Sequence, residues 1–537
     1  KEEFKILKVT SQYLNNRADP DEGVVFTPNE HALFMVREAI FWRLVQDFPN
    51  VSHDQYHTFI TGLAERRTGE NFLNILCEYQ FQDPSAGDGI FLETLCREIY
   101  GLCKKYDYQI KRGWEAEHVH GWEINSKILE ACKRNMSFSP HLIHSDYLNS
   151  KPKKPVDVII ANPPYVRQEY LSSDYKQKLI EQFQPEFPGI KLSVRCDLYI
   201  YFLLKVLKNL NKNGVFTFII PNSWMDNSYG EILRTLFRDE FQLLSITDSG
   251  SRHFKQEVNT VIISGIRKNP AKNNQIIVNL DQKSKSISQE RLRLLDLGWH
   301  GSLFRCPSWL LKQITENKAL GAIGDEFSVC SGIITGNNRA YYHQQKTDNS
   351  LPAIRSPKET TSIRFTQSDV QSWIQKNGAG FSIRKAPLLW IDLRGGRHVV
   401  IWNQDNLPFE HTFYGLHPKD GKNVEAWAYV MNSSWVWLMV ELFGRRGLGG
   451  GAVRLVKNDL VKLPIPLFAN IKFPSNLSGF LERPIYNWRT ELEQEDRKRV
   501  DDRIFKAIGM GEKQKECMIL LRSLMEKRES KARSVHD

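Results

Sequence analysis

The stretch that decides the fold of this chain is Val156-Asp157-Val158-Ile159-Ile160-Ala161-Asn162-Pro163-Pro164-Tyr165. Its apolar run predicts a buried strand, and the two prolines end that strand abruptly. Beyond the strand stand an amide side chain, two carbonyls without nearby N–H competitors, and an aromatic ring. Such a set can accept both N–H bonds of an exocyclic amine and stack on the planar group that carries it. Taken alone, the stretch would also fit a strand followed by a stiff turn, so its surroundings must decide.

Short apolar runs alternate with longer amphipathic stretches from Gly23 to about Lys268. This alternation predicts an α/β fold, a doubly wound, mainly parallel Rossmann-like sheet with helices on both faces. Ligands of such sheets bind at the carboxyl ends of the strands, where every motif below falls. We expect strands at Phe81–Asp83, His118–Trp122, His141–Ile143, Val156–Ala161, Val215–Pro221, Leu243–Asp248 and Thr260–Ile266. We expect helices at His31–Asp47, Gly89–Lys105, Ser126–Asn135, Asp197–Leu210 and Gly230–Asp239.

A glycine loop, Asp83-Pro84-Ser85-Ala86-Gly87-Asp88-Gly89, follows the first expected strand and opens a helix. Gly87 and Gly89 allow positive φ and a close approach of the backbone to a ligand, and the helix N-terminus offers N–H groups to a carboxylate. The loop is neither the dinucleotide fingerprint nor a P-loop. Because Asp83 would repel a pyrophosphate and attract an ammonium group, a zwitterion such as a methionine moiety fits better. An ordinary strand–helix turn is the alternative.

Two further acidic residues end the next two strands. Glu123 can bind both hydroxyls of a ribose. Asp146 can accept a hydrogen bond from an adenine amino group, while Tyr147 or Ile124 covers the ring. The alternatives are an ordinary surface carboxylate at Glu123 and a turn aspartate at Asp146.

Four features follow one another along the chain: the glycine loop, the candidate ribose ligand Glu123, the candidate adenine ligand Asp146 and Asn-Pro-Pro-Tyr. This is the order of a methyl-donor site beside a methyl-acceptor site. In this the chain resembles gamma-class N6-adenine DNA methyltransferases of type II restriction–modification systems, which carry a C-terminal target-recognition domain. Gly23-Val24-Val25-Phe26-Thr27-Pro28 is similar to the family's segment that folds over the methionine end of the cofactor. The resemblance therefore adds Phe26, Thr27 and Pro28 to the expected cofactor site. It is close over 23–265 and looser over 290–468.

The resemblance implies a mechanism and a cofactor, S-adenosyl-L-methionine. A target adenine would be flipped out of double-stranded DNA. The Asn162 side chain and the Pro163 carbonyl would hold its amino group, within the motif that Pro164 and Tyr165 complete, and Tyr165 would stack on the base. Phe254 would clamp the other face, with core packing as its alternative. The amine would attack the methyl group directly, which agrees with the absence of the Pro-Cys nucleophile of cytosine-C5 enzymes.

The composition turns polar between Asn269 and Arg293, where a domain boundary is expected. We predict a helical lead-in over 1–22, the methyltransferase domain over 23–270, an α+β target-recognition domain over 290–470 and a helical segment over 474–537. The charged run Glu491–Arg499 in that last segment is typical of a solvated helix face.

The second domain contains two arginine–glycine segments that could bind DNA. Arg394 and Arg397 flank Gly395-Gly396, and the stretch Gly444–Arg454 contains Arg445, Arg446 and Arg454. Glycines let a backbone approach phosphates, while guanidinium groups reach phosphates or guanine edges. Two stretches are similar to parts of target-recognition domains. One is the second of these segments together with the Leu463-Pro464-Ile465-Pro466 that follows it, and the other is Ser331–Asn337. A flexible surface loop is the alternative for each.

Composition limits the partners and the location. A formal net charge of +11, with 13 Trp, 18 Tyr and 29 Phe, favours nucleic acid. No apolar run approaches the roughly 20 residues that span a bilayer. The 8 cysteines form no Cys-x-x-Cys pair, which predicts free thiols and no metal site. We expect a monomer in a bacterial or archaeal cytoplasm, associated with the nucleoid. Its expected partner is double-stranded DNA, and a separate cognate restriction endonuclease would complete a restriction–modification system.

Asn-Pro-Pro-Tyr leaves other acceptors open. N4-cytosine DNA methyltransferases also act on an exocyclic amine, but they more often have Ser at the position of Asn162. Enzymes that methylate RNA or protein glutamine share the motif and are usually smaller. A relic fold that only binds DNA is disfavoured because every expected site residue is present. Few residues precede Phe26, so we expect no fused nuclease and no cleavage. The recognition sequence, and the choice between restriction protection and regulation, stay open.

Overall fold

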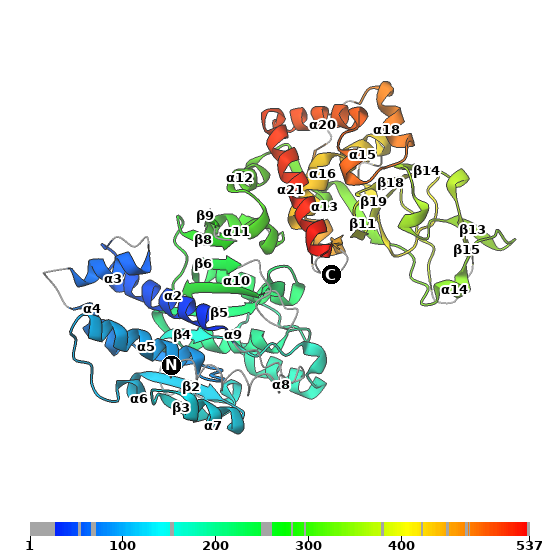
Figure 1. Ribbon diagram of the computed structural model, residues 1–537. Helices are drawn as coiled ribbons and strands as arrows, with labels where there is room; N and C mark the ends of the chain where they lie inside the picture. The colour runs from blue at the N-terminus through cyan, green and yellow to red at the C-terminus, as the bar shows by residue number, and fades with distance from the viewer. Residues whose placement is uncertain are drawn as a thin grey trace. The chain divides into compact units, whose positions relative to one another are not determined.

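The structure is a computed structural model, in which the chain forms two compact units, Lys1–Arg293 and Leu294–Asp537 (Figure 1). It describes residues 27–533 apart from 52–54, 66–70, 151–154, 249–259, 281–282, 295–296, 377–380, 420, 422, 447–450, 468–470 and 472. The expected lead-in over 1–22, Phe26 and Phe254 therefore lie outside the described residues.

The first unit is built on a nine-stranded sheet of order β3-β2-β1-β4-β5-β7-β6-β8-β9. Strands β3, β2, β1, β4 and β5 run parallel, and β7 lies antiparallel between β5 and β6. The mainly parallel sheet predicted from the sequence is therefore confirmed. The strands are β1 (Phe81–Asp83), β2 (Val119–Glu123), β3 (His141–His144), β4 (Val156–Ala161), β5 (Leu210–Pro221), β6 (Gln242–Asp248), β7 (Thr260–Ile266), β8 (Gln275–Leu280) and β9 (Lys283–Ser288).

Helices cover both faces of this sheet because its central strands are apolar on both sides. Val158 and Ile160 of β4 belong to one core cluster with α2 and α5, whereas Ile159 points to the opposite face and is also fully buried. A strand buried on both faces reads as a continuous apolar run, which is how β4 reads. The helices are α2 (Asn29–Asp47), α3 (Tyr56–Ala64), α4 (Phe72–Glu78), α5 (Ile90–Lys105), α6 (Trp114–His118), α7 (Ser126–Asn135), α8 (Ser173–Phe183), α9 (Leu198–Asn209), α10 (Glu231–Asp239) and α11 (Gln289–Leu294).

The first unit extends past residue 270, where its domain was expected to end, to Arg293 at the far end of the polar segment in which a boundary was expected. The polar segment that follows contains β8 and β9, which extend the same sheet: β8 pairs with β6, and β9 pairs with β8. These two strands lie at the outer edge of the sheet, where one face can remain solvated and a polar composition is tolerated. The first unit consequently ends at Arg293.

The second unit contains a five-stranded sheet of order β11-β19-β16-β18-β14, together with shorter pairs and helices. Its helices α20 and α21 pack on α16, so the C-terminal segment belongs to this unit. The strands are β10 (Leu320–Ala322), β11 (Phe327–Ser331), β12 (Tyr342–His343), β13 (Ser350–Ala353), β14 (Arg364–Phe365), β15 (Ser372–Gln375), β16 (Leu388–Ile391), β17 (Leu393–Arg394), β18 (Val400–Asn403), β19 (Phe413–Pro418), β20 (Val453–Arg454) and β21 (Pro464–Pro466). The helices are α12 (Ser308–Glu316), α13 (Ile323–Glu326), α14 (Asn338–Tyr341), α15 (Val424–Met431), α16 (Ser434–Phe443), α17 (Lys457–Leu460), α18 (Ser478–Glu482), α19 (Trp488–Glu491), α20 (Glu495–Ala507) and α21 (Gln514–Arg533).

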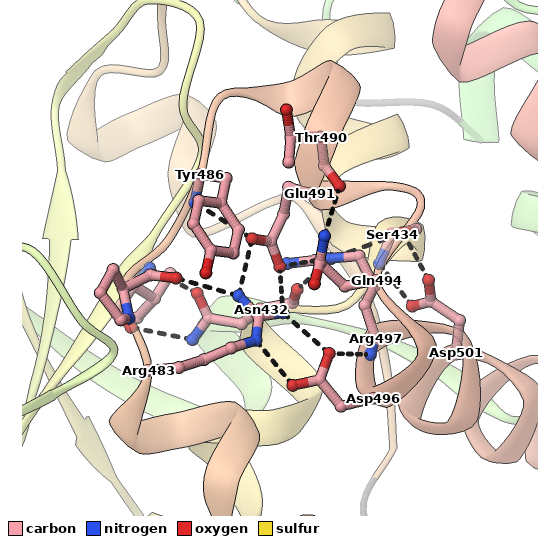
Figure 2. A network of polar contacts seen from close by, with 12 residues as sticks. Asn432, Ser434, Arg483, Tyr486, Thr490, Glu491, Gln494, Asp496, Arg497 and Asp501 are labelled. Atoms are coloured by element: carbon pink, nitrogen blue, oxygen red, sulfur yellow. Dashed lines mark hydrogen bonds and ion pairs between the residues drawn. The ribbon is translucent and has the colours of Figure 1, made fainter.

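The charged run Glu491–Arg499 is not simply a solvated face, as Figure 2 shows. Glu491 is fully buried and accepts hydrogen bonds from Arg497 Nε at 2.8 Å and from both terminal nitrogens of Arg483. Arg497 is 1% exposed and also donates to the Asn432 carbonyl at 2.9 Å. The run alternates between buried charges that bind each other and exposed ones, which composition alone cannot distinguish.

No helix of the described residues is long and apolar enough to cross a membrane.

Candidate functional site

The glycine loop and the Asn-Pro-Pro-Tyr motif meet at the carboxyl edge of the first sheet. They follow β1 and β4, which are neighbours at the point where the strand order reverses. Loops diverge at such a switch point and leave a crevice for a ligand. Ser85 Oγ donates to the Asn162 carbonyl at 3.1 Å, so the two motifs are directly connected across 77 residues of sequence.

The glycine loop has the conformation that its sequence predicts. Gly87 has φ of 55° and Gly89 has φ of 84°, values that L side chains rarely adopt. A Cβ at Gly89 would also lie 2.6 Å from Cys132 Sγ, because α7 packs closely against the loop. Both glycines are therefore required, and the loop presents its backbone at the start of α5.

Asp83 is a buried carboxylate with one oxygen that could bind a ligand. Its side chain is 1% exposed, and its Oδ1 accepts a hydrogen bond from the Ser85 N–H at 3.0 Å. Its Oδ2 is buried and has no hydrogen-bond partner among the described residues. Burial, with smaller contributions from Glu123 and Asp88, raises the pKa of Asp83 to about 8. A ligand ammonium group would satisfy Oδ2 and stabilise the ionised carboxylate, so the residue fits the amino end of a methionine moiety.

Glu123 is held at the end of β2 by the loops on either side. Its Oε2 accepts from the Gly87 N–H at 3.0 Å and its Oε1 from the Asn125 N–H at 2.8 Å. Burial raises the pKa of this carboxyl, while these backbone hydrogen bonds oppose that rise. The carboxylate is thus fixed beside the glycine loop, as a ribose-binding acid would be.

Asp146 lies one strand further and caps a short 3-10 helix, accepting from the Leu148 N–H at 2.9 Å and from Asn149 Nδ2 at 2.6 Å. The turn role that was its alternative is therefore present. Ile124 is 66% exposed, which suits a side chain that covers a purine ring. Ile124 thus remains a candidate for the adenine-covering residue.

The prediction that Tyr147 could cover the adenine is wrong. Its side chain is 2% exposed, and its ring stacks on Phe202 of α9. Gln82 Nε2 and Asn209 Nδ2 both donate to its hydroxyl, at 2.6 and 2.8 Å. Tyr147 is a core residue that joins β1 to α9, because the 3-10 helix after β3 turns its ring inward.

Thr27 orients the Asn162 side chain. Asn162 Nδ2 donates to Thr27 Oγ1 at 3.0 Å, and Thr27 is 8% exposed. The hydrogen bond restrains the rotation of the amide, and with Nδ2 directed at Thr27 the Oδ1 atom is the one that would accept from an incoming amine. Thr27 was expected at the methionine end of the cofactor, but sequence could not indicate this contact, which spans 135 residues.

Tyr165 and the loop behind it are also held rigidly. The Tyr165 hydroxyl donates to the Ile219 carbonyl of β5 at 2.9 Å, and Tyr199 packs edge-on against its ring with centroids 6.4 Å apart. Asp197 Oδ1 accepts from the Gln168 N–H at 3.0 Å and so anchors the loop that follows the motif. Asp197 was not predicted as part of the site, although its place before an apolar helical run is a signal of a helix start.

The five arginines proposed as DNA contacts lie in the second unit, and the prediction for Arg394 is wrong. Its side chain is 2% exposed, its guanidinium stacks on the Trp390 ring at 3.8 Å, and its Nε donates to the Ile391 carbonyl. Burial lowers the pKa of Arg394 to about 9. A buried guanidinium cannot reach a phosphate or a base edge.

The other four arginines have internal partners. Arg397 donates to two backbone carbonyls, and Arg446 is paired with the buried Glu441. Arg445 forms an ion pair with Asp459 and Arg454 one with Asp392, both at 2.7 Å. Arg454 is the most exposed of the paired three, with 43% of its side chain accessible. Their contact with DNA stays a prediction.

Residues 91–254 match the model of the Eco57I restriction-modification methylase family. The chain is 35% identical over 204 residues to the type II methyltransferase M.BanIII of Aneurinibacillus aneurinilyticus, covering 35% of this chain and 32% of that protein. It is 34% identical over 191 residues to the type II methyltransferase M.XhoI of Xanthomonas vasicola, covering 32% of this chain and 34% of that protein. The resemblance to restriction–modification methyltransferases is therefore confirmed over the matched part of the first unit.

A solved structure extends the likeness in fold to most of the chain. The type IIL restriction-modification enzyme MmeI, solved in complex with DNA, aligns with a TM-score of 0.56 at 13% identity, covering 94% of this chain and 79% of that one. The chain spans about a third of the length of the curated relatives it matches, at 32% and 34% of the two named above. The activity of the whole protein is accordingly a matter for proposal.

Proposed function

We propose that the protein is a site-specific DNA methyltransferase that transfers a methyl group from S-adenosyl-L-methionine to N6 of an adenine flipped out of double-stranded DNA. The observation that carries this is the position of Asn162: its side-chain amide donates to Thr27 Oγ1 at 3.0 Å, and its main-chain carbonyl accepts from Ser85 Oγ of the glycine loop at 3.1 Å. An amide fixed in this way, next to a site for an ammonium group, suits methyl transfer to an exocyclic amine.

The residues of the chain would contribute by binding and positioning. Asn162 Oδ1 and the Pro163 carbonyl would accept the two N–H bonds of the adenine amine, which holds its lone pair toward the methyl donor. Tyr165, tethered to Ile219, would stack on the extruded base and offset part of the unstacking cost of a few kcal/mol. Positioning of this kind converts a bimolecular step into an effectively unimolecular one.

Asp83, the glycine loop, Glu123, Asp146 and Ile124 would hold the cofactor. The cofactor supplies, when bound, a methyl group activated by attachment to a positively charged sulfur. Asp83 would bind its ammonium group and the N–H groups at the start of α5 its carboxylate, while Glu123 would bind the ribose.

A direct test is to methylate plasmid DNA with the purified protein and to locate modified bases by long-read sequencing. We expect N6-methyladenine at a single sequence motif. N4-methylcytosine at such a motif would replace the proposed acceptor by its nearest alternative, and methylated RNA or protein with DNA untouched would refute the proposal. The same experiment, repeated with and without a candidate endonuclease, tests whether the modification protects DNA from cleavage.

The raised pKa of Asp83 predicts that the free energy of unfolding of the protein depends on pH. The pKa of this carboxyl is raised from 3.8 to about 8 in the folded chain, so between these values the folded chain binds a proton that the unfolded chain has lost. The free energy of unfolding must therefore fall as pH rises through this window. We expect Asp83→Asn to remove that part of the slope, measured by chemical denaturation of both proteins between about pH 5 and 8.

Binding of the cofactor gives an independent readout of the same carboxyl. An ammonium ligand favours the ionised form, so binding near pH 7 should release a proton from Asp83 in the wild type and none from that position in Asp83→Asn. Calorimetry in buffers of different ionisation enthalpy measures this release. Equal proton release by the two proteins would contradict the assignment of Asp83 to the ammonium group.

A further inference from the structure

Two large aliphatic side chains are exposed at one edge of the five-stranded sheet in the second unit. Ile334 is 63% exposed and Leu393 is 53% exposed. Ile334 lies in the loop between β11 and α14, and Leu393 is the first residue of β17; both follow residues that contact the turn Glu410–Phe413, which leads into β19. Single exposed aliphatic residues are common on proteins, whereas two that lie beside one turn suit contact with a common partner.

The sheet register brings these residues to the turn from opposite sides. Strand β19 lies between β11 and β16. Beyond the end of β11, Ile333 pairs with Glu410, and the His411 N–H donates to the Ile333 carbonyl at 3.2 Å. Beyond the end of β16, the Asp392 N–H donates to the Thr412 carbonyl at 3.0 Å. Ile334 and Leu393 are the residues that follow these two contacts, so they stand at one edge of the sheet.

The segment that carries Ile334 is firmly fixed. A Cβ at Gly332 would lie 2.2 Å from the Glu410 carbonyl oxygen, so the two backbones are in close contact. Asn338 Nδ2 donates to the buried Glu410 carboxylate at 3.0 Å, and Thr335 Oγ1 donates to Asn338 Oδ1 at 2.6 Å. The exposed isoleucine is thus presented by an ordered loop.

The segment that carries Leu393 is fixed by a short two-stranded pair. Leu393 pairs with Arg454 and Arg394 with Val453. Arg454 Nε also donates to both carboxylate oxygens of Asp392, at 3.1 and 2.9 Å. Because both aliphatic residues are held in place before any partner arrives, little conformational entropy would be lost when they bind one.

Basic side chains lie near the strands that carry this apolar pair. Arg384 and Lys457 are exposed, the charges of both act on Cys330 of β11, and the Arg384 carbonyl accepts from the Phe409 N–H beside the turn. His411 and Arg454 at the same edge have 51% and 43% of their side chains exposed, but they pair with Glu410 and Asp392, so the positive charge offered to phosphates comes from Arg384 and Lys457. An apolar surface with a basic rim suits DNA, since cationic groups bind phosphates while aliphatic groups contact thymine methyl groups and base faces.

We infer that Ile334 and Leu393 contact the bases of the DNA target and are specificity-determining residues of the proposed methyltransferase. The inference rests on the proposed function and assigns base contact to apolar side chains, since the nearby Arg394 is buried and Arg445, Arg446 and Arg454 have acidic partners. Arg384 and Lys457 bind flanking phosphates.

The test compares Ile334→Ala and Leu393→Ala with wild type in the full-length chain. The probes are two fluorescent duplexes, one with the motif that the wild type methylates and one with that motif scrambled. We expect each variant to lose about tenfold in affinity for the motif duplex and little for the scrambled one, because base contacts carry the discrimination. Ile519→Ala on α21 removes an aliphatic side chain of 60% exposure in the same unit and should bind both duplexes like wild type.

Arg384→Ala is expected to weaken binding to both duplexes alike. The slope of log affinity against log salt concentration should fall by the amount expected for about one phosphate contact. Unchanged binding by both Ile334→Ala and Leu393→Ala would overturn the inference, as would equal losses on the two duplexes. A change in oligomeric state by sedimentation would also overturn it, because the surface would then join copies of the chain. A wild type that methylates no DNA would instead refute the proposed function, so the two failures are distinguishable.

Discussion

Replacing Asn162 by Ala is expected to lower the rate of methyl transfer to DNA by on the order of 10³-fold, because the residue supplies a fixed acceptor that positions the attacking amine. Its Nδ2 donates to Thr27 Oγ1 at 3.0 Å, and this contact restrains the amide in the site. The initial rate of transfer from a labelled methyl donor to DNA measures the effect.

Cofactor binding should change little in this variant, since Asp83 and Glu123 lie on other strands and keep their own backbone hydrogen bonds. Calorimetric titration with the methyl donor checks this. Thr27→Val provides a matched control: it keeps the volume at the buried position and removes the hydroxyl that orients the amide, so an intermediate loss is expected. Near-normal turnover by Asn162→Ala would show that the amine is held elsewhere.

The second large effect concerns stability. Glu491→Gln is expected to destabilise the second unit by about 3–5 kcal/mol, because it leaves the buried Arg497 without its charged partner. Burial opposes ionisation of Glu491, but hydrogen bonds from Arg483 and the charge of Arg497 outweigh it and hold the pKa of this carboxyl below its ordinary range. Urea unfolding followed by tryptophan fluorescence measures the change.

Glu495→Gln is the control from the same charged run. Glu495 is 79% exposed and pairs with Lys498 at 2.8 Å, and exposed pairs contribute roughly 0–1 kcal/mol. Since the native carboxylate of Glu491 has a lowered pKa, its contribution must also be lost as pH falls through that pKa, and the wild type should approach the variant in acid. Equal destabilisation by the two substitutions would contradict the role of the buried network.

Much of the first unit could be predicted because its signals are local. The strands β1, β4 and β7 and the helix α7 begin and end at the residues that the sequence indicates. Each is a compact apolar or amphipathic run. The first unit extends past 270 because β8 and β9 continue the sheet: β8 is a short apolar run within a polar segment, and β9 is a polar edge strand whose order comes from its pairing with β8.

The candidate site also contains features that local sequence predicts and features that only packing decides. The sequence singled out Asp83, Gly87, Gly89, Glu123 and Asn162 by their spacing and their position after strands, and the structure brings them to one edge of the sheet; their binding roles stay predictions. The sequence could not decide whether Tyr147 or Ile124 would cover the adenine ring, because the direction of a side chain after a strand depends on the residues that pack there. Tyr147 points into the core, where its ring stacks on Phe202 and its hydroxyl accepts from Asn209. The same limit applied to Arg394, which stacks on Trp390.

The sequence by itself determined the fold class, the order of the site segments and the kind of group that each can bind, because backbone conformation and side-chain chemistry are written residue by residue. Only the tertiary structure decided which polar groups bind each other and which keep an atom that a ligand could bind. Contacts such as Asn162 with Thr27 and Glu491 with Arg497 arise when distant segments pack. A charged or aromatic residue becomes a binding group only where the surrounding chain leaves it accessible and in a fixed orientation.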